Sequence, residues 1–404
     1  MNSILFLVHR LPYPPNKGDK ITSFNLLKYL SKRYPIYLAC FVDDKADWQH
    51  VGYVKSFCKE SCILGLNSKA AKIFSVRGLL TGEPLSLPYY RSQKMQTWVD
   101  DVLKLESIDS VLIFSGVMAQ YVTGKIAPEI RTVLDLEDVD SDKWRSYAKG
   151  HRWPMSWIYR REAERLLAFE SAMAEEFDAT VFVSKDEAEF FKSLVPSVAD
   201  KVVHRVQGVD SAFFDPALDY ENPYRVSDRV LVFTGAMDYW PNINAAVWFA
   251  KKIFPKVRAQ VNNACFYIVG MNPSDEVKTL ENISGVFVTG GVPDMRPYIA
   301  HAEFSVVPLR LARGIQNKVL EAMAMEKPIL ATSNALLGIH NYPGFLPLTA
   351  DDEKQLIEGA LALLAGTIGQ NVQSGRACVL EHYNWDTNLR KIELLLQDGL
   401  EVNS

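Results

Sequence analysis

The sequence predicts an α/β protein with two domains, each built on a parallel β-sheet. Short apolar runs recur along the chain and are separated by segments with helical periodicity. The runs do not alternate apolar and polar residues, which is typical of strands that helices bury on both faces. The length of 404 residues fits two domains of roughly 100–200 residues each.

The strands are expected at the apolar runs. In the first half we place them at 3–8, 36–42, 61–66, 110–115, 132–136, 179–184 and 201–206. In the second half we place them at 229–235, 265–270, 285–290, 304–308, 327–332 and 345–348. Residues 208–228 carry two prolines, several acidic residues and no clean period, which predicts the domain boundary there. Residues 382–398 have the pattern of a late amphipathic helix.

Composition and charge narrow the class of protein. The net charge of −4 argues against a dedicated nucleic-acid binder. No apolar run reaches the roughly 18 residues of a membrane span, and the N-terminal run is too short for a signal peptide, so we expect a cytoplasmic protein. The five cysteines are scattered, which predicts neither a disulfide framework nor a structural zinc site.

The strongest candidate site lies at residues 308–332, which have the pattern strand, short loop, helix, strand. Gly314 precedes the helix and would let the backbone approach a ligand closely. The N–H groups at the start of a helix are a ready site for phosphate. We expect these groups to belong to Ile315, Gln316 and Asn317.

Charged side chains surround the same loop. Arg310, Arg313 and Lys318 bring three cations to it, and Asn317, Lys318 and Glu321 share one side of the helix by their spacing. A nucleoside diphosphate suits this set, because cations and amides would bind its phosphates and Glu321 would accept hydrogen bonds from its ribose. The alternative is an ordinary surface helix with a Lys–Glu pair three residues apart.

Several motifs resemble a known family. They are GVDSAFF at 208–214, TG…PN…A at 234–246, IVG at 268–270, VTG at 288–290 and LEAMA…KPILAT at 320–332. Their order and spacing resemble the retaining GT-B glycosyltransferases of the large family 4. Three further blocks resemble the sugar transferases associated with bacterial exosortase and exopolysaccharide gene clusters: HRLPYPPNKGDK at 9–20, DVDSDKW at 138–144 and ARGIQNKVLEAMA at 312–324.

The resemblance implies two Rossmann-like domains facing a cleft. Residues 208–381 would bind the nucleotide-sugar donor, and residues 1–207 the acceptor, with the helix in 382–404 crossing back onto the first domain. It also implies retention of the anomeric configuration and no need for a metal or other cofactor. The implied donor contacts outside the helix start are Gly235, Asn242, Gly290 and Val292.

The chain departs from the family pattern in two places. The family has two glutamates eight residues apart; Glu321 matches the second, but Arg313 stands at the first. The loop at 234–246 lacks the usual Arg and Lys that bind the diphosphate. A leaving diphosphate needs its developing charge stabilised. We therefore expect Lys318 and Arg313, with the helix start, to replace the missing pair.

Two loops in the first half are further candidates. Gly18 and Lys20 follow the first strand, where the family carries a Gly-rich loop that touches the donor; the alternative is a surface turn with solvated lysines. The acidic run at 132–144 follows a later strand and suggests a general base or a sugar-hydroxyl ligand, with Asp138 as first choice. Magnesium binding is a weaker interpretation of that run, and helix capping is the other alternative.

Residues 143–165 invert the local charge of this acidic protein. Lys and Arg there are interleaved with Trp and Tyr, which is typical of a segment at a membrane interface. A lipid-linked acceptor at the inner membrane surface would suit it. Contacts to an acceptor pyrophosphate and a solvated basic helix with its aromatic residues in the core are the alternatives; nucleic acid is disfavoured by the overall charge.

Together these observations predict a nucleotide-sugar-dependent glycosyltransferase of the hexosyl type. The acceptor would be a hydroxyl of a glycan or lipid-linked molecule, in bacterial exopolysaccharide or surface-glycan synthesis. The candidate catalytic residues are Asp138, Arg313, Lys318 and Glu321. The alternatives are a GT-B-type sugar-nucleotide epimerase and a non-catalytic scaffold that binds nucleotide sugars.

Overall fold

The computed structural model describes residues 2–312 and 314–397. Contacts divide the chain into two compact units, which we call the N-terminal unit and the C-terminal unit. Of the described residues, the first holds 2–206 and 386–397, and the second holds those between 207 and 385. Each unit is described by itself.

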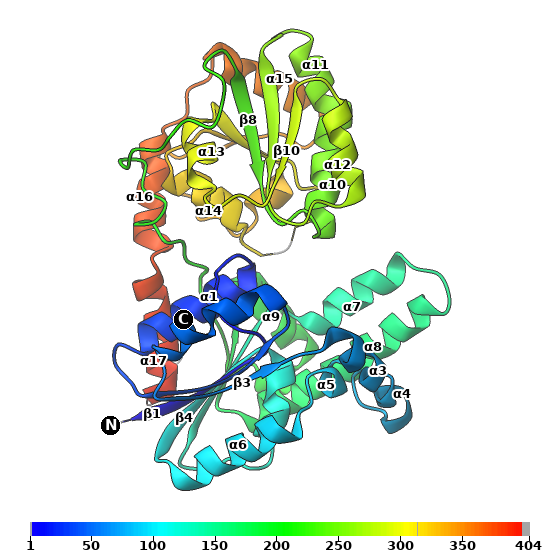
Figure 1. The fold of residues 1–404 in the computed structure, drawn as a ribbon, viewed down its shortest axis with the longest axis vertical. Helices are drawn as coiled ribbons and strands as arrows, with labels where there is room; N and C mark the ends of the chain where they lie inside the picture. Colours follow the sequence, from blue (N-terminus) through cyan, green and yellow to red (C-terminus); the bar gives the residue numbers. More distant parts are fainter. Residues whose placement is uncertain (1, 313, 398–404) are drawn as a thin grey trace. The chain divides into compact units, whose positions relative to one another are not determined.

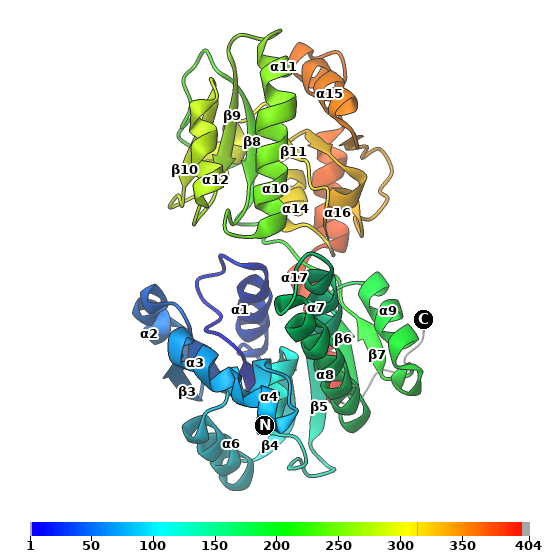
Figure 2. The same cartoon turned by 90° about the vertical axis from the view of Figure 1, so that its right-hand side faces the viewer.

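The N-terminal unit is built on a seven-stranded sheet whose paired strands are all parallel (Figures 1 and 2). The order is β3-β2-β1-β4-β5-β6-β7. Every residue of β1 and β2 is buried, as expected for strands covered on both faces. The strands are β1 (Ser3–Val8), β2 (Ile36–Val42), β3 (Glu60–Gly65), β4 (Ile108–Phe114), β5 (Arg131–Glu137), β6 (Ala179–Phe182) and β7 (Val202–His204).

Helices connect these strands. A 3-10 helix, η2 (Gly116–Tyr121), follows β4 directly. The α-helices before residue 206 are α1 (Gly18–Leu30), α2 (Val51–Lys55), α3 (Ser68–Ser75), α4 (Arg77–Thr81), α5 (Ser86–Tyr89), α6 (Gln93–Leu105), α7 (Asp140–Lys149), α8 (Met155–Glu176) and α9 (Lys185–Leu194).

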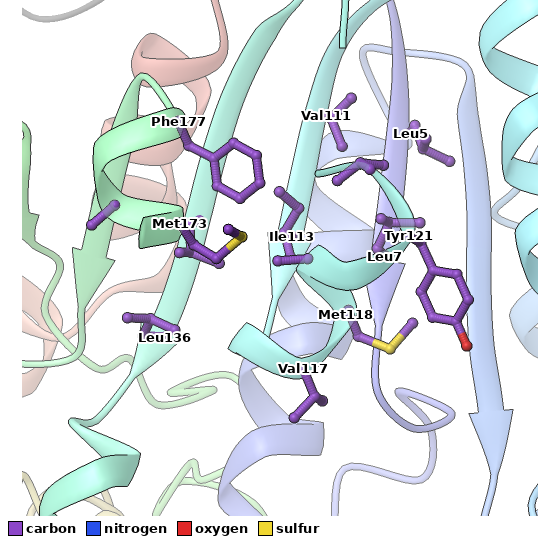
Figure 3. Close-up of a cluster of buried hydrophobic side chains, with 14 of the residues drawn as sticks. Leu5, Leu7, Val111, Ile113, Val117, Met118, Tyr121, Leu136, Met173 and Phe177 are labelled. Carbon is purple, nitrogen blue, oxygen red and sulfur yellow. The ribbon is translucent and has the colours of Figure 1, made fainter. Parts of the chain in front are cut away.

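The core of this unit lies between the middle strands and the elements packed on them (Figure 3). Met118 and Tyr121 of η2 and Met173 near the end of α8 cover the apolar side chains of β1, β4 and β5. The buried strand residues in this cluster include Leu5, Leu7, Val111, Ile113, Leu134 and Leu136. This layer fixes the carboxyl ends of the central strands, where functional residues are expected.

A helix from beyond the C-terminal unit completes the N-terminal unit. Helix α17 (Trp385–Gln397) belongs to it from residue 386 onward. The Glu393 carboxylate accepts hydrogen bonds from the hydroxyls of Tyr29, at 2.6 Å, and Tyr34, at 2.8 Å. Arg131 Nε donates to the Leu395 carbonyl at 3.1 Å. The predicted helix crossing back to the first domain is confirmed.

The C-terminal unit is built on a six-stranded sheet, again with parallel pairs. The order is β10-β9-β8-β11-β12-β13. The strands are β8 (Arg229–Thr234), β9 (Ala264–Val269), β10 (Val286–Gly290), β11 (Phe304–Val307), β12 (Ile329–Ala331) and β13 (Leu348–Thr349). The α-helices are α10 (Trp240–Trp248), α11 (Phe254–Arg258), α12 (Asp275–Lys278), α13 (Arg296–His301), α14 (Asn317–Ala324), α15 (Glu353–Ala365) and α16 (Val372–His382).

The predicted α/β class with two parallel sheets is confirmed. Four expected strands are shorter than predicted by two residues or more. Of 179–184 only Ala179–Phe182 (β6) is a strand, and of 327–332 only Ile329–Ala331 (β12). Of 201–206 only Val202–His204 forms β7, although the Lys201 carbonyl accepts from the Thr180 amide and the Arg205 amide donates to the Phe182 carbonyl of β6. Of 345–348 only Leu348 is in a strand, since Phe345 and the residues around it form a turn.

Candidate functional site

Each sheet has a point where the strand order reverses. It lies between β1 and β4 in the N-terminal unit and between β8 and β11 in the C-terminal unit. In open parallel sheets, ligands bind outside the carboxyl ends of the strands at such a point. The predicted site residues all follow strand ends, and we take the C-terminal unit first.

Three of the predicted residues meet at the carboxyl end of β8. A Cβ atom on Gly235 would lie 2.8 Å from the Asn242 side-chain nitrogen and 3.3 Å from Lys318 Cε, so only glycine fits there without displacing them. Lys318 Nζ donates to Asn242 Oδ1 at 3.2 Å, and Asn242 Nδ2 donates to the Ala236 carbonyl at 2.9 Å. The loop after β8 therefore positions Lys318 through Asn242.

The charge of Lys318 is poorly solvated. Burial lowers the pKa of its ammonium to about 8, and nearby Glu321 offsets only part of this effect. Burial likewise raises the pKa of Glu321 to about 7, with Lys318 opposing the shift. A desolvated cation near neutrality gains from an added negative charge, so an anion suits this position.

The loop between β11 and α14 differs from the expectation. Helix α14 begins at Asn317, and Gln316 is its extended N-cap residue. Gln316 Nε2 donates to the carbonyl of Gly314, whose φ of 61° is readily adopted by glycine. The amides of Ile315 and Gln316 therefore precede the helix. The N–H groups at the start of the helix are therefore those of Asn317 and Lys318, not those of Ile315 and Gln316. The Val319 N–H does not join them, because it already donates to the Gln316 carbonyl.

Of the two arginines in this loop, the structure describes Arg310 but not Arg313. Arg310 is exposed but held: its guanidinium donates twice to Asn244 Oδ1, at 3.0 and 2.8 Å, and stacks over the Trp248 ring at 4.9 Å. Helix α10 thus carries both Asn242, which positions Lys318, and the partners of Arg310.

The loops after β9 and β10 are joined to the same edge. A Cβ atom on Gly270 would lie 1.7 Å from the Gly235 carbonyl oxygen, so these two loops touch backbone to backbone. The Gly270 amide donates to the Gly290 carbonyl at 3.1 Å. Val292 is partly buried and packs against the apolar cluster that includes Tyr224. A structural role explains Val292, and its predicted donor contact stays a prediction.

In the N-terminal unit, Gly18 and Lys20 lie in the first turn of α1. A Cβ atom on Gly18 would meet nothing within 4 Å, so the backbone there is open. Lys20 is 2% exposed, and its ammonium is bonded to the Asp47 carboxylate. This buried pair accounts for Lys20 structurally, and the geometry argues against the predicted contact of Lys20 with the donor.

Asp138 lies directly after β5, as predicted, but its carboxylate is already paired. Lys143 Nζ lies 2.9 Å from an oxygen of Asp138 and 2.9 Å from one of Asp140. The pKa of Lys143 is raised well above its usual value: burial opposes the rise, but the two carboxylates outweigh it. Much of the acidic run thus forms a local ion-pair cluster at the start of α7.

The neighbouring Glu137 is the residue that the sequence interpretation passed over. Its φ of 61° is rare for a residue with a side chain, and such strain is typical of functional positions. Buried Arg205 lies 2.8 Å from Asp135 and 3.3 Å from Glu137. Burial raises the pKa of Glu137 to about 8; Arg205 opposes the shift, and the nearby Asp135 and Asp19 carboxylates add to it. Side chains two residues apart in a strand share one face, as Asp135 and Glu137 do. This spacing is the sequence signal that could have identified Glu137.

A second charge cluster follows β1. Asp19 Oδ2 lies 3.1 Å from His9 Nε2 and 3.1 Å from Arg10 Nη1. Arg10 Nε also lies 3.5 Å from Asp43 after β2. Burial would raise the pKa of Asp19, but its contacts with His9 and Arg10 hold that pKa below its usual range. The sequence interpretation did not single out His9, Arg10 or Asp19, because charge alone does not tell a strand-end cluster from a solvated turn.

The described residues contain neither a group of metal ligands nor a membrane-spanning helix. Over residues 2–312 and 314–397, no three His, Cys, Asp or Glu side chains are grouped as they would be around a metal ion. Over the same ranges, no helix is both long and apolar enough to span a membrane.

The comparisons with known proteins agree with this architecture. Residues 228–366 match the family described as "Glycosyl transferases group 1". None of the curated proteins matches the chain.

Solved structures resemble the whole fold at low sequence identity. HepE from Anabaena, crystallised with UDP and glucose, has a TM-score of 0.67 at 13% identity, covering 99% of this chain and 100% of its own. A sucrose-phosphate synthase from Thermosynechococcus elongatus scores 0.70 at 15% identity, covering 98% of each chain. A glycosyltransferase from Rickettsia africae scores 0.64 at 14% identity, covering 98% of this chain and 99% of its own. The predicted GT-B fold is confirmed.

Proposed function

We propose that this protein is a retaining glycosyltransferase that moves a hexosyl group from a nucleoside-diphosphate sugar to a hydroxyl of a glycan or lipid-linked acceptor. One observation carries the proposal. The partly buried ammonium of Lys318 is held by Asn242 at the switch point of the C-terminal sheet, within the region that matches the glycosyl transferases group 1 family. The metal independence of the reaction and its place in bacterial exopolysaccharide or surface-glycan synthesis belong to the same proposal.

The donor diphosphate would bind against Lys318 and the first amides of α14. Its negative charge would favour the protonated ammonium, whose pKa burial has lowered to about 8. As the bond to the sugar breaks, charge builds on the diphosphate, and a preorganised cation stabilises it. Arg310 stands at the same loop, and Arg313 completes the set of cations in our proposal.

The nucleoside would lie beside Glu321, whose carboxylate accepts hydrogen bonds from ribose hydroxyls. The loops at Gly235 and Gly290 would border the base and the sugar. Because HepE was crystallised with UDP and with UDP-glucose, uridine nucleotides are the first donors to test. In front-side retention the leaving diphosphate helps to deprotonate the acceptor hydroxyl, so enzyme groups mainly position and stabilise.

The acceptor would bind to the N-terminal unit. Asp138 stays a candidate for contact with the acceptor or the reacting sugar, although Lys143 already pairs with its carboxylate. Gly18 offers open backbone at the start of α1. Contact of residues 143–165 with the cytoplasmic face of the inner membrane would bring a lipid-linked acceptor within reach.

The first test is a thermal-shift panel with UDP, GDP, ADP and their common sugars, each with EDTA and with Mg²⁺. We expect one nucleoside diphosphate to raise the melting temperature by a few degrees with EDTA present, since a ligand at 100 times its Kd adds about 2.7 kcal/mol. A shift that needs Mg²⁺ would contradict metal independence. No shift with any nucleotide would contradict the donor site.

The second test uses Lys318→Ala. We expect it to abolish the nucleotide shift and to lower turnover by about 10²–10³, the usual cost of losing one charge-stabilising group. Lys251→Ala, at an exposed lysine of the same unit, is the matched control and should keep both. Analysis of the products distinguishes the enzyme classes: a new sugar nucleotide formed without acceptor would indicate an epimerase, and binding without turnover a scaffold.

A further inference from the structure

One side of the N-terminal unit exposes large apolar side chains from two separate segments. Leu80 on α4 is 90% exposed, Trp153 in the turn before α8 is 81% exposed, and Ile73 on α3 is 74% exposed. Single exposed apolar residues need no explanation, but a group of them marks an interaction site. The group consists of Ile73, Phe74, Val76, Leu80, Tyr147, Trp153, Met155 and Trp157. This group and the basic residues named below form one surface, which we call the apolar–basic face.

The two segments are fastened to each other. Arg161 on α8 donates from Nη2 to the carbonyls of Gly78, at 2.5 Å, and Glu83, at 3.2 Å. Buried Glu162 accepts the amides of Leu85, at 2.7 Å, and Ser86, at 3.1 Å. Figures 1 and 2 show α3 and α4 on the same side of this unit as the turn between α7 and α8. The exposed side chains of both segments therefore belong to one surface.

The charge of this surface is positive throughout. Residues 68–82 and 143–161 contain no Asp or Glu, although the protein as a whole carries a net charge of −4. Six of their basic side chains are exposed and surround the apolar group: Lys69, Lys72, Arg77, Lys149, Arg152 and Arg160. Arg77 stacks over the Phe74 ring at 5.1 Å, so apolar and basic groups are interleaved rather than segregated.

We propose that the apolar–basic face docks the protein onto a lipid bilayer that contains anionic lipids. Trp and Tyr side chains lie at the level of the lipid headgroups, and Lys and Arg bind the phosphates around them. The Ile73–Leu80 segment and the Trp153–Trp157 segment would each insert apolar side chains. This docking site extends beyond residues 143–165 to α3 and α4, and it does not depend on the sugar-transfer reaction.

Charge complementarity favours a bilayer over the other occupants. A second copy of the chain would bring the same basic residues against one another, which costs energy at a self-complementary contact. A nucleic acid would leave the exposed Leu, Ile and Met side chains without apolar partners, since its backbone is bound mainly through charge. A membrane interface satisfies both properties of the face at once.

The test is sedimentation of the full-length protein with phosphatidylcholine vesicles, with and without phosphatidylglycerol. We expect binding that requires the anionic lipid and weakens as salt is raised. Leu80→Ser and Trp153→Ala remove exposed side chains, so they should fold normally. Each should weaken vesicle binding by about fivefold, and Lys72→Glu by about tenfold or more.

Matched controls exist on the same unit. Leu105, at the end of α6, is 81% exposed, and Lys104 beside it is exposed as well. Leu105→Ser and Lys104→Glu should leave vesicle binding within about twofold, since surface changes away from an interface have small effects. Retention of the nucleotide-induced thermal shift in all five variants would separate this site from the donor site.

Three outcomes would overturn the proposal. The first is no binding to anionic vesicles by the wild-type protein. The second is equal weakening by the control variants, which would indicate general electrostatic adsorption. The third is a stable dimer that Leu80→Ser and Trp153→Ala dissociate while vesicle binding is unchanged. Failure here with an intact nucleotide shift would leave the proposed enzymatic function standing, and the reverse pattern would leave the docking site standing.

Discussion

At the carboxyl edge of the C-terminal sheet, Lys318 has the neutral amide of Asn242 as its hydrogen-bond partner, and only part of its charge is balanced by Glu321. At the same edge of the N-terminal sheet, Arg205 stands between Asp135 and Glu137. Burial lowers the pKa of Lys318, whereas the two carboxylates raise the pKa of Arg205 against the effect of burial.

The difference has a chemical consequence for each edge. A cation whose charge is only partly balanced becomes more stable when an anion binds beside it, which suits a diphosphate. Near neutrality, where Glu137 is protonated, Arg205 and Asp135 form a matched ion pair that gains little from a further anion, and the Glu137 carboxyl can hydrogen-bond neutral hydroxyls. In the proposed function, the C-terminal sheet would therefore hold the anion site and the N-terminal sheet the hydroxyl site.

The largest expected effect is on the N-terminal network. Arg205→Met leaves the fully buried Asp135 carboxylate without its partner, so we expect a loss of about 3–5 kcal/mol in the free energy of unfolding. Urea denaturation followed by circular dichroism measures it. Arg33→Met, which breaks a half-exposed pair with Glu393, should lose no more than about 1 kcal/mol. Similar losses in both variants would contradict the matched-charge description.

The next effect is the pH dependence of stability at Glu137. Because its pKa is raised to about 8, the folded protein binds a proton more tightly than the unfolded chain between about pH 4.5 and 8. The stability contributed by this proton is present below pH 4.5 and is lost as the pH rises to 8. Glu137→Gln removes the titration, so its stability relative to wild type should rise over that window, by up to about 5 kcal/mol in total.

Urea denaturation at a series of pH values measures this difference. Glu276→Gln, at an exposed glutamate of the C-terminal unit, is the control and should give a difference that does not change with pH. A flat difference for Glu137→Gln as well would mean that Glu137 is ionised throughout and that the network is fully compensated.

The third effect concerns the affinity of the C-terminal edge for UDP. Above about pH 8 the Lys318 ammonium loses its proton, and binding of a diphosphate must then restore it. We expect the affinity for UDP to fall by up to about tenfold per pH unit above that value. Lys318→Arg keeps a permanent charge and should flatten the profile. Calorimetric titration measures the affinity for UDP of the wild type and of Lys318→Arg at each pH. An affinity of the wild type that does not change with pH would contradict the proposed role of the Lys318 ammonium.

The smallest effect is expected at Asp138. Its pair with Lys143 is about one-third exposed, so Asp138→Asn should change the free energy of unfolding by about 1 kcal/mol or less. We also expect turnover to fall less in Asp138→Asn than in Glu137→Gln, because burial raises the pKa of Glu137 to about 8, where its carboxyl can exchange a proton near neutrality. The opposite order would restore Asp138 as the acceptor-side residue, as the sequence analysis had it.

The fold was predictable because its strands are buried on both faces. Runs such as residues 3–8 and 36–42 show in the sequence as continuous apolar segments, and both became strands with the predicted ends. The end of β7 was not predictable. Arg205 lies directly beyond that strand, and the pairing of Arg205 with Asp135, 70 residues earlier, leaves no local mark in the sequence.

The candidate site was predictable only in part. The grouping of Gly235, Asn242 and Lys318 follows from strand ends that meet at one edge, which strand order and motif position indicate. The burial of Lys20 could not be foreseen, because its partner Asp47 lies 27 residues away, in a 3-10 helix at Lys45–His50. The exposure of apolar side chains on α3 and α4, such as Ile73 and Leu80, was not foreseen either, because the sequence does not say whether other parts of the protein cover such side chains.

Helix α17 makes the order of synthesis matter. The chain leaves the N-terminal unit near residue 206 and returns to it only at residue 386. A ribosome must therefore make the whole C-terminal unit before the helix that accepts the Tyr29 and Tyr34 hydroxyls exists. Until then the N-terminal unit exposes the surface that Leu389 and Ile392 later bury. A chain that stops early in the C-terminal unit thus carries an unfinished first unit as well, and proteases can recognise both defects at once.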